Sequence, residues 1–187
     1  MILKTKRLIL RPITLKDKKS ITENINNINI SKWLLIVPYP YKIKDAVWWI
    51  NHTIKSSKEK DRKDYDFGIE LKEEEKIIGG IGLSKVDRYA GTGTLGYWLG
   101  QRYHRKGYGS EALEVLIDFA FNKLKLRRLE AGVFVGNPSS GKLLEKYGFK
   151  QEGYLREAKK CKADGKIKDE IMYGLLRSEY KKQGRKR

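Results

Sequence analysis

The chain has 187 residues and a formal net charge of +18, a length that suits one domain with a sizeable core, expected over residues 1–180 and followed by a basic tail at 181–187. It contains no run of eighteen apolar residues and no apolar stretch behind a charged start. The composition therefore argues against a membrane span or a secretory signal and favours a cytoplasmic protein.

The first half of the chain predicts a strand followed by helices. The elements expected there are a strand at residues 7–11, a helix and loop at 14–29, a loop at 33–40 and a helix at 45–54. Alternation of apolar and charged side chains up to Pro12 indicates a half-buried strand. Thr14 and Asp45 are expected to cap the helices that follow them.

The second half predicts a strand-rich region interrupted by two helices. The strands expected are 65–71, 76–86, 94–99, 128–135, 149–162 and 167–176, and the helices are 107–124 and 139–147. A strand, helix and strand in succession imply a right-handed parallel crossover between 94–99 and 128–135. Asp164 and Gly165 indicate a hairpin between the last two strands.

The most informative feature is the segment 104–109, His-Arg-Lys-Gly-Tyr-Gly, which we call the glycine turn. It connects a predicted strand to a helix whose apolar residues form one stripe. The first turn of a helix leaves backbone N–H groups without intrahelical partners, and the helix dipole makes that end partially positive. Gly107 and Gly109 allow an anion to approach the backbone closely. The glycine turn therefore predicts a phosphate site.

Two other glycine patterns compete for this role. The spacing G-x-G-x-x-G that begins at Gly91 runs into the β-prone residues 97–99, whereas dinucleotide binding requires a helix there. A P-loop-like spacing begins at Gly136 but ends at Leu143, which has no hydroxyl for Mg²⁺. Both patterns are weaker than the glycine turn.

Positive charge and the single cysteine bear on partners and metals. A field of this sign attracts polyanions and phosphorylated ligands, so contact with RNA or the ribosome is one interpretation. The lysines are scattered without a recognition-helix or RNP pattern, which favours a solvated basic surface. Because Cys161 is the only cysteine, no disulfide or cysteine zinc site can form within the chain, and no metal is expected.

Four segments occur in one order: Gly-Tyr-Trp-Leu at 96–99, Lys-Gly-Tyr-Gly-Ser-Glu-Ala at 106–112, Asn-Pro-Ser-Ser at 137–140 and Gly-Phe-Lys-Gln-Glu-Gly at 148–153. This series resembles the GNAT superfamily of acyl-CoA N-acyltransferases, specifically its RimJ/RimL-like branch of ribosomal-protein N-terminal acetyltransferases. The resemblance implies an α/β fold with a mixed, mostly antiparallel sheet and helices on both faces. The sheet would be splayed between its fourth and fifth strands, here 94–99 and 128–135, with the pantetheine of acetyl-CoA in the split.

The resemblance also implies positions for the cosubstrate. The pyrophosphate would bind the N–H groups of residues 107–110, Asn137 would lie near the pantetheine, and Lys142 and Lys146 near the ribose phosphate. The cofactor-binding residues expected in this way are Tyr97, Trp98, Leu99, Arg102, Arg105, Lys106, Gly107, Tyr108, Gly109, Ser110, Asn137, Ser140 and Lys142. His104 replaces the glutamine or arginine usual at the head of the turn, a departure that leaves the backbone N–H groups of the pyrophosphate site unaffected.

The catalytic residues are less completely indicated. Many relatives carry a tyrosine acid at the position of Leu144, whereas Ser140 matches the serine acid of the RimL-like branch. Ser140 is therefore expected to protonate the departing CoA thiolate. The positions where relatives carry a basic carboxylate are Thr94 and Lys159 here, which leaves Glu157 and Asp169 on the last hairpin as weak candidates.

A weak base favours an acceptor that is already partly neutral. An α-amine has a pKa of about 7.7 to 8.0, whereas a lysine side chain has one of about 10.4. We therefore expect acetyl transfer from acetyl-CoA to a protein N-terminus by direct attack, with N–H groups near Leu99 holding the oxyanion. Alternatives are a small amine, such as a polyamine or aminoglycoside, and a non-catalytic CoA- or RNA-binding module.

Overall fold

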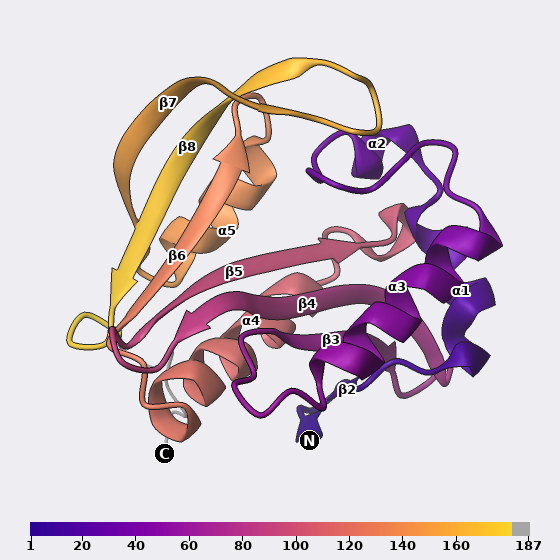
Figure 1. The fold of residues 1–187 in the computed structure, drawn as a ribbon, viewed down its shortest axis with the longest axis horizontal. Helices are drawn as coiled ribbons and strands as arrows, with labels where there is room; N and C mark the ends of the chain where they lie inside the picture. The colour runs from indigo at the N-terminus through magenta and orange to yellow at the C-terminus, as the bar shows by residue number, and fades with distance from the viewer. Residues whose placement is uncertain (181–187) are drawn as a thin grey trace.

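The computed structural model describes residues 1–180, so the predicted basic tail at 181–187 lies outside the described residues. One eight-stranded sheet runs through the described part in the order β1-β2-β3-β4-β5-β6-β8-β7 (Figure 1). Its strands are β1 (Leu3–Lys4), β2 (Leu8–Arg11), β3 (Tyr65–Leu71), β4 (Lys76–Asp87), β5 (Thr92–Leu99), β6 (Arg128–Phe134), β7 (Lys150–Lys160) and β8 (Ile167–Leu176). The helices are η1 (Leu15–Asp17), α1 (Lys18–Ile25), α2 (Ile28–Ser31), α3 (Ile43–Ser56), η2 (Gln101–Tyr103), α4 (Tyr108–Asp118), η3 (Phe119–Lys123) and α5 (Pro138–Lys146).

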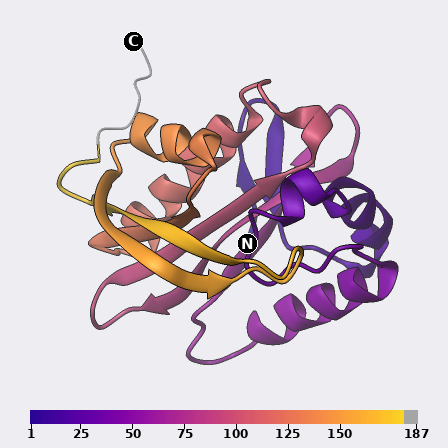
Figure 2. The same cartoon turned by 90° about the horizontal axis from the view of Figure 1, so that it is seen from above.

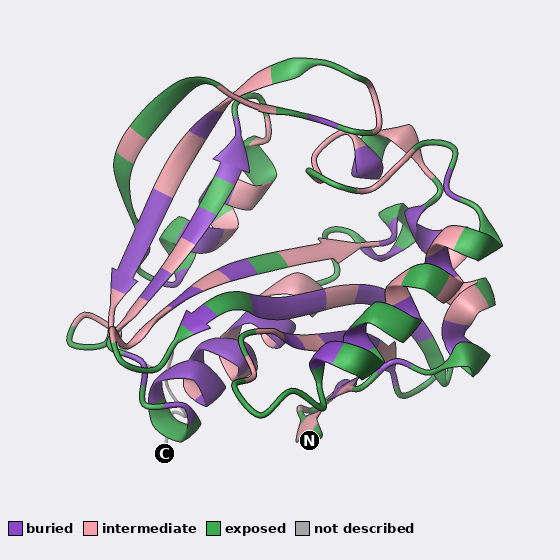
Figure 3. Ribbon diagram, viewed as in Figure 1, coloured by how far each residue is buried: buried purple, intermediate pink, exposed green. Residues whose placement is uncertain are grey.

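Helices cover both faces of the sheet, as Figure 2 shows. Strand alternation decides which side chains face which layer: Phe67 and Ile69 of β3 join the larger core with α4, whereas Asp66 and Gly68 face the opposite side. A second, smaller core lies on that side and includes buried residues of α1 and α3. Purple segments in Figure 3 mark the buried parts of these elements. The predicted mixed α/β fold with a mostly antiparallel sheet is confirmed.

The sheet is split between β5 and β6. These strands are parallel, but they pair only from Thr92 with Arg128 to Thr94 with Glu130. Beyond that point they diverge (Figure 1), and β6 pairs instead with β8 along its whole length. The predicted parallel crossover and the predicted place of the split are both confirmed.

Most predicted helix ends agree with the structure, and two details differ. Thr14 caps η1, as expected. Asp45 is the third residue of α3 rather than its cap, because Lys42 holds the cap position and its N–H donates to Asp45 Oδ2 at 2.8 Å. The helix predicted to continue from the glycine turn to residue 124 changes from α-helical to π-helical hydrogen bonding at Phe119. Among the described residues no helix is long and apolar enough to cross a membrane.

Candidate active site

The glycine turn forms the start of α4. Gly107 is the cap residue with φ of +82°, a left-handed conformation that strains any residue with a Cβ atom. Glu111 N–H makes a hydrogen bond to the Gly107 carbonyl at 3.1 Å. The N–H groups of Tyr108, Gly109 and Ser110 come before it, so no carbonyl one turn earlier is available to them. The predicted helix start is confirmed, and its amides suit a diphosphate.

Arg7, in the bend just before β2, holds the glycine turn. Its Nη1 donates to the Lys106 carbonyl at 3.0 Å, its Nε donates to Glu111 Oε2 at 2.7 Å, and its guanidinium lies 4.5 Å from the centre of the Tyr108 ring. Burial alone would raise the pKa of Glu111, but hydrogen bonds from Thr5 and Arg7 lower it below its ordinary value. The carboxylate therefore stays ionised, and the turn is held in shape by side chains that no local sequence pattern connects.

The basic residues expected around the turn are not equivalent. Arg102 is paired with Glu74, at 3.0 Å, and its guanidinium lies over the Tyr103 ring. Arg105 and Lys106 are exposed at the turn itself. His104 Nε2 lies 2.9 Å from the Leu99 carbonyl, so its ring ties the turn to the end of β5. Of the predicted cations, Arg105 and Lys106 are the two positioned to supply mobile positive charge there.

The edge of β5 presents amides to the split. Gly100 N–H donates to the Ile78 carbonyl at 2.8 Å, and Gly79 stands opposite Leu99. Because backbone groups of alternate residues point to opposite neighbours, the N–H groups of Tyr97 and Leu99 point away from β4 and toward the split. An extended chain carrying amides could pair with this edge as an added strand.

Ser140 meets β5 across the split. Asn137 caps α5, and its side chain accepts a hydrogen bond from Ser140 N–H at 3.4 Å. Ser140 Oγ lies 2.7 Å from Tyr97 Oη, which also donates to the Ser140 carbonyl at 3.2 Å. Burial raises the pKa of Tyr97 to about 12 although its hydrogen bond with Ser140 lowers it, so this hydroxyl keeps its proton near neutral pH. The structure thus pairs the predicted acid with a tyrosine expected only to bind cofactor.

Helix α5 also packs against the start of α4. Tyr147 Oη donates to the Ser110 carbonyl at 2.7 Å, and Lys146 Nζ lies 3.3 Å from Ser110 Oγ. A Cβ atom added at Gly109 would lie 3.4 Å from both Leu143 Cδ2 and Leu99 Cδ1. The glycine turn, the end of β5 and the start of α5 therefore lie next to one another. These residues fit a thioester carrier with a diphosphate, because amides at the helix start, a bare glycine and an amide-bearing strand edge are all present.

Three predicted residues lie elsewhere. Trp98 is on the opposite face of β5, where its Nε1 covers Gly80. Glu157 is exposed on β7, the outermost strand, with φ of +48° and its N–H bonded to Asp169 Oδ1. Lys142 is exposed on α5. β8 separates Glu157 on β7 from β6 and the split. The catalytic role of Glu157 and the cofactor-binding role of Lys142 stay predictions.

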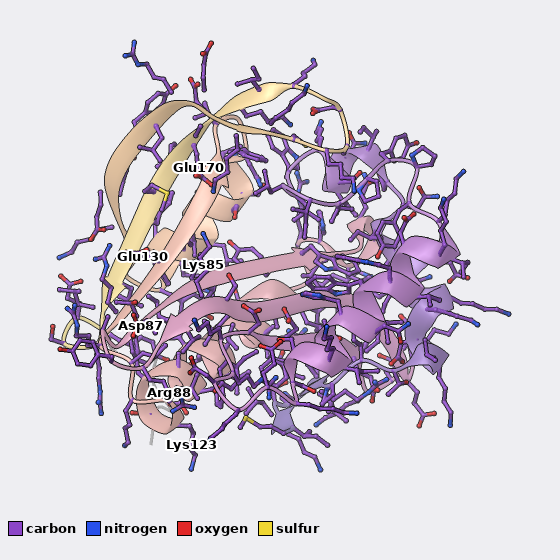
Figure 4. The ribbon with its side chains drawn as sticks, in the orientation of Figure 1. Lys85, Asp87, Arg88, Lys123, Glu130 and Glu170 are labelled. Atoms are coloured by element: carbon purple, nitrogen blue, oxygen red, sulfur yellow. The ribbon has the colours of Figure 1, made fainter. Side chains whose placement is uncertain are left out.

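Two carboxylates were missed by sequence reasoning. Glu170 on β8 (labelled in Figure 4) is buried, with Lys159 Nζ donating to its Oε1 at 2.8 Å and its Oε2 without a hydrogen bond among the described residues. Asp66 lines a cavity of about 570 Å³ on the α1 and α3 face of the sheet. The available signal for Asp66 was an acidic residue between the aromatic residues Tyr65 and Phe67 of β3, but its neighbours in space come from other strands.

Comparisons with known proteins agree with this geometry. Residues 7–150 match the family model described as an acetyltransferase (GNAT) domain. The chain is 34% identical over 178 residues to an uncharacterised N-acetyltransferase, p20, of Bacillus licheniformis, covering 94% of this chain and 96% of that protein. It is 31% identical over 115 residues to the [ribosomal protein uS5]-alanine N-acetyltransferase of Escherichia coli, covering 61% of this chain and 58% of that protein.

A solved structure shares the fold. The spermidine N-acetyltransferase of Vibrio cholerae, determined with CoA and spermine, superposes with a TM-score of 0.78 at 24% identity, covering 94% of this chain and 99% of that one. Together with the family match, these similarities show that the chain belongs to the GNAT family of acetyl-CoA-dependent N-acetyltransferases.

Proposed function

We propose that this enzyme acetylates the α-amine of a protein N-terminus, with ribosomal proteins as the leading substrate class. The observation that carries the proposal is the pairing of Ser140 with Tyr97 beside the glycine turn: it offers a hydroxyl acid, and no carboxylate among the described residues is hydrogen-bonded to either hydroxyl. A site without a base at this pair suits an amine with a pKa of about 7.7 to 8.0 better than a lysine side chain.

Acetyl-CoA supplies a thioester whose carbonyl carbon the amine attacks, so that a C–N bond forms and the C–S bond breaks. Ser140 Oγ gives its proton to the departing sulfur and takes one in return from the attacking nitrogen, which loses a proton as the amide forms. The neutral Tyr97 hydroxyl orients Ser140 by hydrogen bonding. Because a thiol pKa is about 8.5, a weak acid suffices. In this proposal, the N–H groups of Tyr97 and Leu99 at the strand edge hold the carbonyl oxygen.

The name of the Escherichia coli relative, an alanine N-acetyltransferase of a ribosomal protein, supports this choice of substrate. The charge of +18 would favour encounters with a ribosome or with RNA, and we include this contact in the proposal. A cytoplasmic location follows from the same substrate.

A library of peptides with free N-termini tests the proposal, with CoA thiol release as the readout. The matched control is each peptide with a blocked N-terminus and one free lysine. We expect turnover only with free α-amines; equal or faster turnover of the blocked peptides would overturn it.

One observation favours a second candidate, a small polyamine. The similar Vibrio cholerae structure holds spermine, and this chain has Asp45 and Asp66 lining its cavity. Spermidine and spermine therefore belong in the same assay.

A further inference from the structure

The cavity beside Asp66 is the part of the molecule that the proposed mechanism does not use. It has a volume of about 570 Å³ and lies between the sheet and the helices of the smaller core. Trp48, Trp49 and Trp98 contribute to its walls. The aromatic faces of tryptophan attract cations, so this lining suits a positively charged group as well as an apolar one.

Between Asp66 and the split, the two aligned positions on β4 and β5 are glycines, which carry no side chain. Asp66, Gly82 and Gly96 stand directly opposite one another on β3, β4 and β5. A Cβ atom at Gly82 would lie 3.0 Å from Asp66 Oδ1, and one at Gly96 would have no atom of another residue within 4 Å. Gly82 and Gly96, opposite each other on neighbouring strands, therefore leave a surface without side chains, which we call the glycine floor. It lies between the Asp66 carboxylate and the strand edge where transfer would take place.

The spacing of the strands sets the distance from Asp66 on β3 to the edge of β5. Neighbouring strands are about 4.8 Å apart, so the backbones of Asp66 and Gly96 are separated by roughly 10 Å. At that distance Asp66 cannot take a proton directly from an amine reacting at the edge of β5. It can hold a second group of the same acceptor.

The surroundings of Asp66 leave its carboxylate free to accept a hydrogen bond from a ligand. No hydrogen bond to this carboxylate is made among residues 1–180. Burial and the neighbouring Asp64 raise the pKa of Asp66 to about 6, while His52 of α3 and Arg62 lower it. Asp45 and Lys162 line the same cavity and contribute one charge of each sign. A half-buried carboxylate without a hydrogen-bond donor gains from a cationic ligand that supplies one.

We infer that Asp66 binds a second positive charge of the acceptor, the ammonium or guanidinium of a lysine or arginine in the second or third residue of the N-terminal segment being acetylated. This inference rests on the proposed function. An extended chain advances about 3.5 Å per residue, so a basic side chain at either position spans the distance from the reacting α-amine to Asp66. The glycine floor accommodates the backbone between them.

The test compares peptides that differ only in lysine or glutamine at the second or third position, assayed by CoA release with the whole chain. We expect kcat/KM to be about tenfold higher or more for the lysine peptides, mainly through KM, since a charged hydrogen bond supplies a difference of this size. Asp66→Asn should bring the ratio close to one. Asp61→Asn, the same charge change at an exposed loop residue, should leave the ratio unchanged.

Each result distinguishes the inference from the proposed function. Peptides that are acetylated equally well with lysine and glutamine would overturn the inference and leave the proposed function standing. A ratio that persists in Asp66→Asn would likewise overturn it. Turnover of spermidine but of no peptide, lost in Asp66→Asn, would overturn the proposed function and support a cation site at Asp66 that serves a free polyamine.

Discussion

Replacing Asp66 by asparagine is expected to stabilise the fold at neutral pH. The pKa of this carboxyl rises from 3.8 in an unfolded chain to about 6 in the structure, chiefly through burial. The folded state therefore binds the proton more tightly than the unfolded state. The ionised side chain lowers the free energy of unfolding above the unfolded pKa of 3.8, and the effect reaches its full size above about pH 6. A difference of about two pKa units corresponds to at most about 3 kcal/mol.

The destabilisation by ionised Asp66 should increase with pH. The destabilising effect is complete above pH 6, falls to about 1 kcal/mol at pH 4.5, and disappears below the unfolded pKa of 3.8. Urea unfolding of wild type and Asp66→Asn at pH 7.5 and 4.5 measures it. At pH 7.5 we expect the midpoint of the variant to be higher by roughly 1 M.

Asp17 supplies the opposite case within the same chain. Burial alone would raise its pKa, but hydrogen bonds from Arg11 and Thr14 lower it below the ordinary value. Asp17→Asn should therefore destabilise the protein at pH 7.5, and the loss should shrink as the pH falls. If Asp66→Asn were less stable than wild type at pH 7.5, or if its advantage were equal at both pH values, the assigned burial cost would be wrong. A carboxylate that lowers stability is expected where function needs it.

The remaining predictions concern the active site. Ser140→Ala should lower kcat at least about tenfold with little change in acetyl-CoA affinity, whereas Ser139→Ala, an exposed serine one residue earlier, should not; equal kcat values would remove Ser140 from the mechanism. Tyr97→Phe should lower kcat less, and a double-mutant cycle should show its effect vanishing in the Ser140→Ala background; additive effects would contradict the orienting role. Gly107→Val should abolish most CoA affinity in calorimetry, while Gly165→Val, with similar left-handed strain at φ of +68°, should retain it; retained affinity in both would refute the diphosphate cradle.

The sequence alone determined what depends on local order. The period of apolar side chains identified the strands and the main helices, and the glycine turn identified the start of α4, because these patterns are set by neighbours a few residues apart. Four segments in one order then implied the family, the place of the split and the role of the residues at 107–110. Each of these features is local, or follows from the order of local features along the chain.

Only the tertiary structure decided which distant residues meet. Tyr97 reaches Ser140 because η2, α4, η3 and β6 come between them in the chain and return α5 to the open edge of β5. Arg7 reaches Glu111 across 104 positions of the chain. The alignment of Asp66 with Gly82 and Gly96 depends on the register of three strands, which no local pattern states. Pairing between strands fixed these contacts, and with them the side of the sheet that we propose for the acceptor.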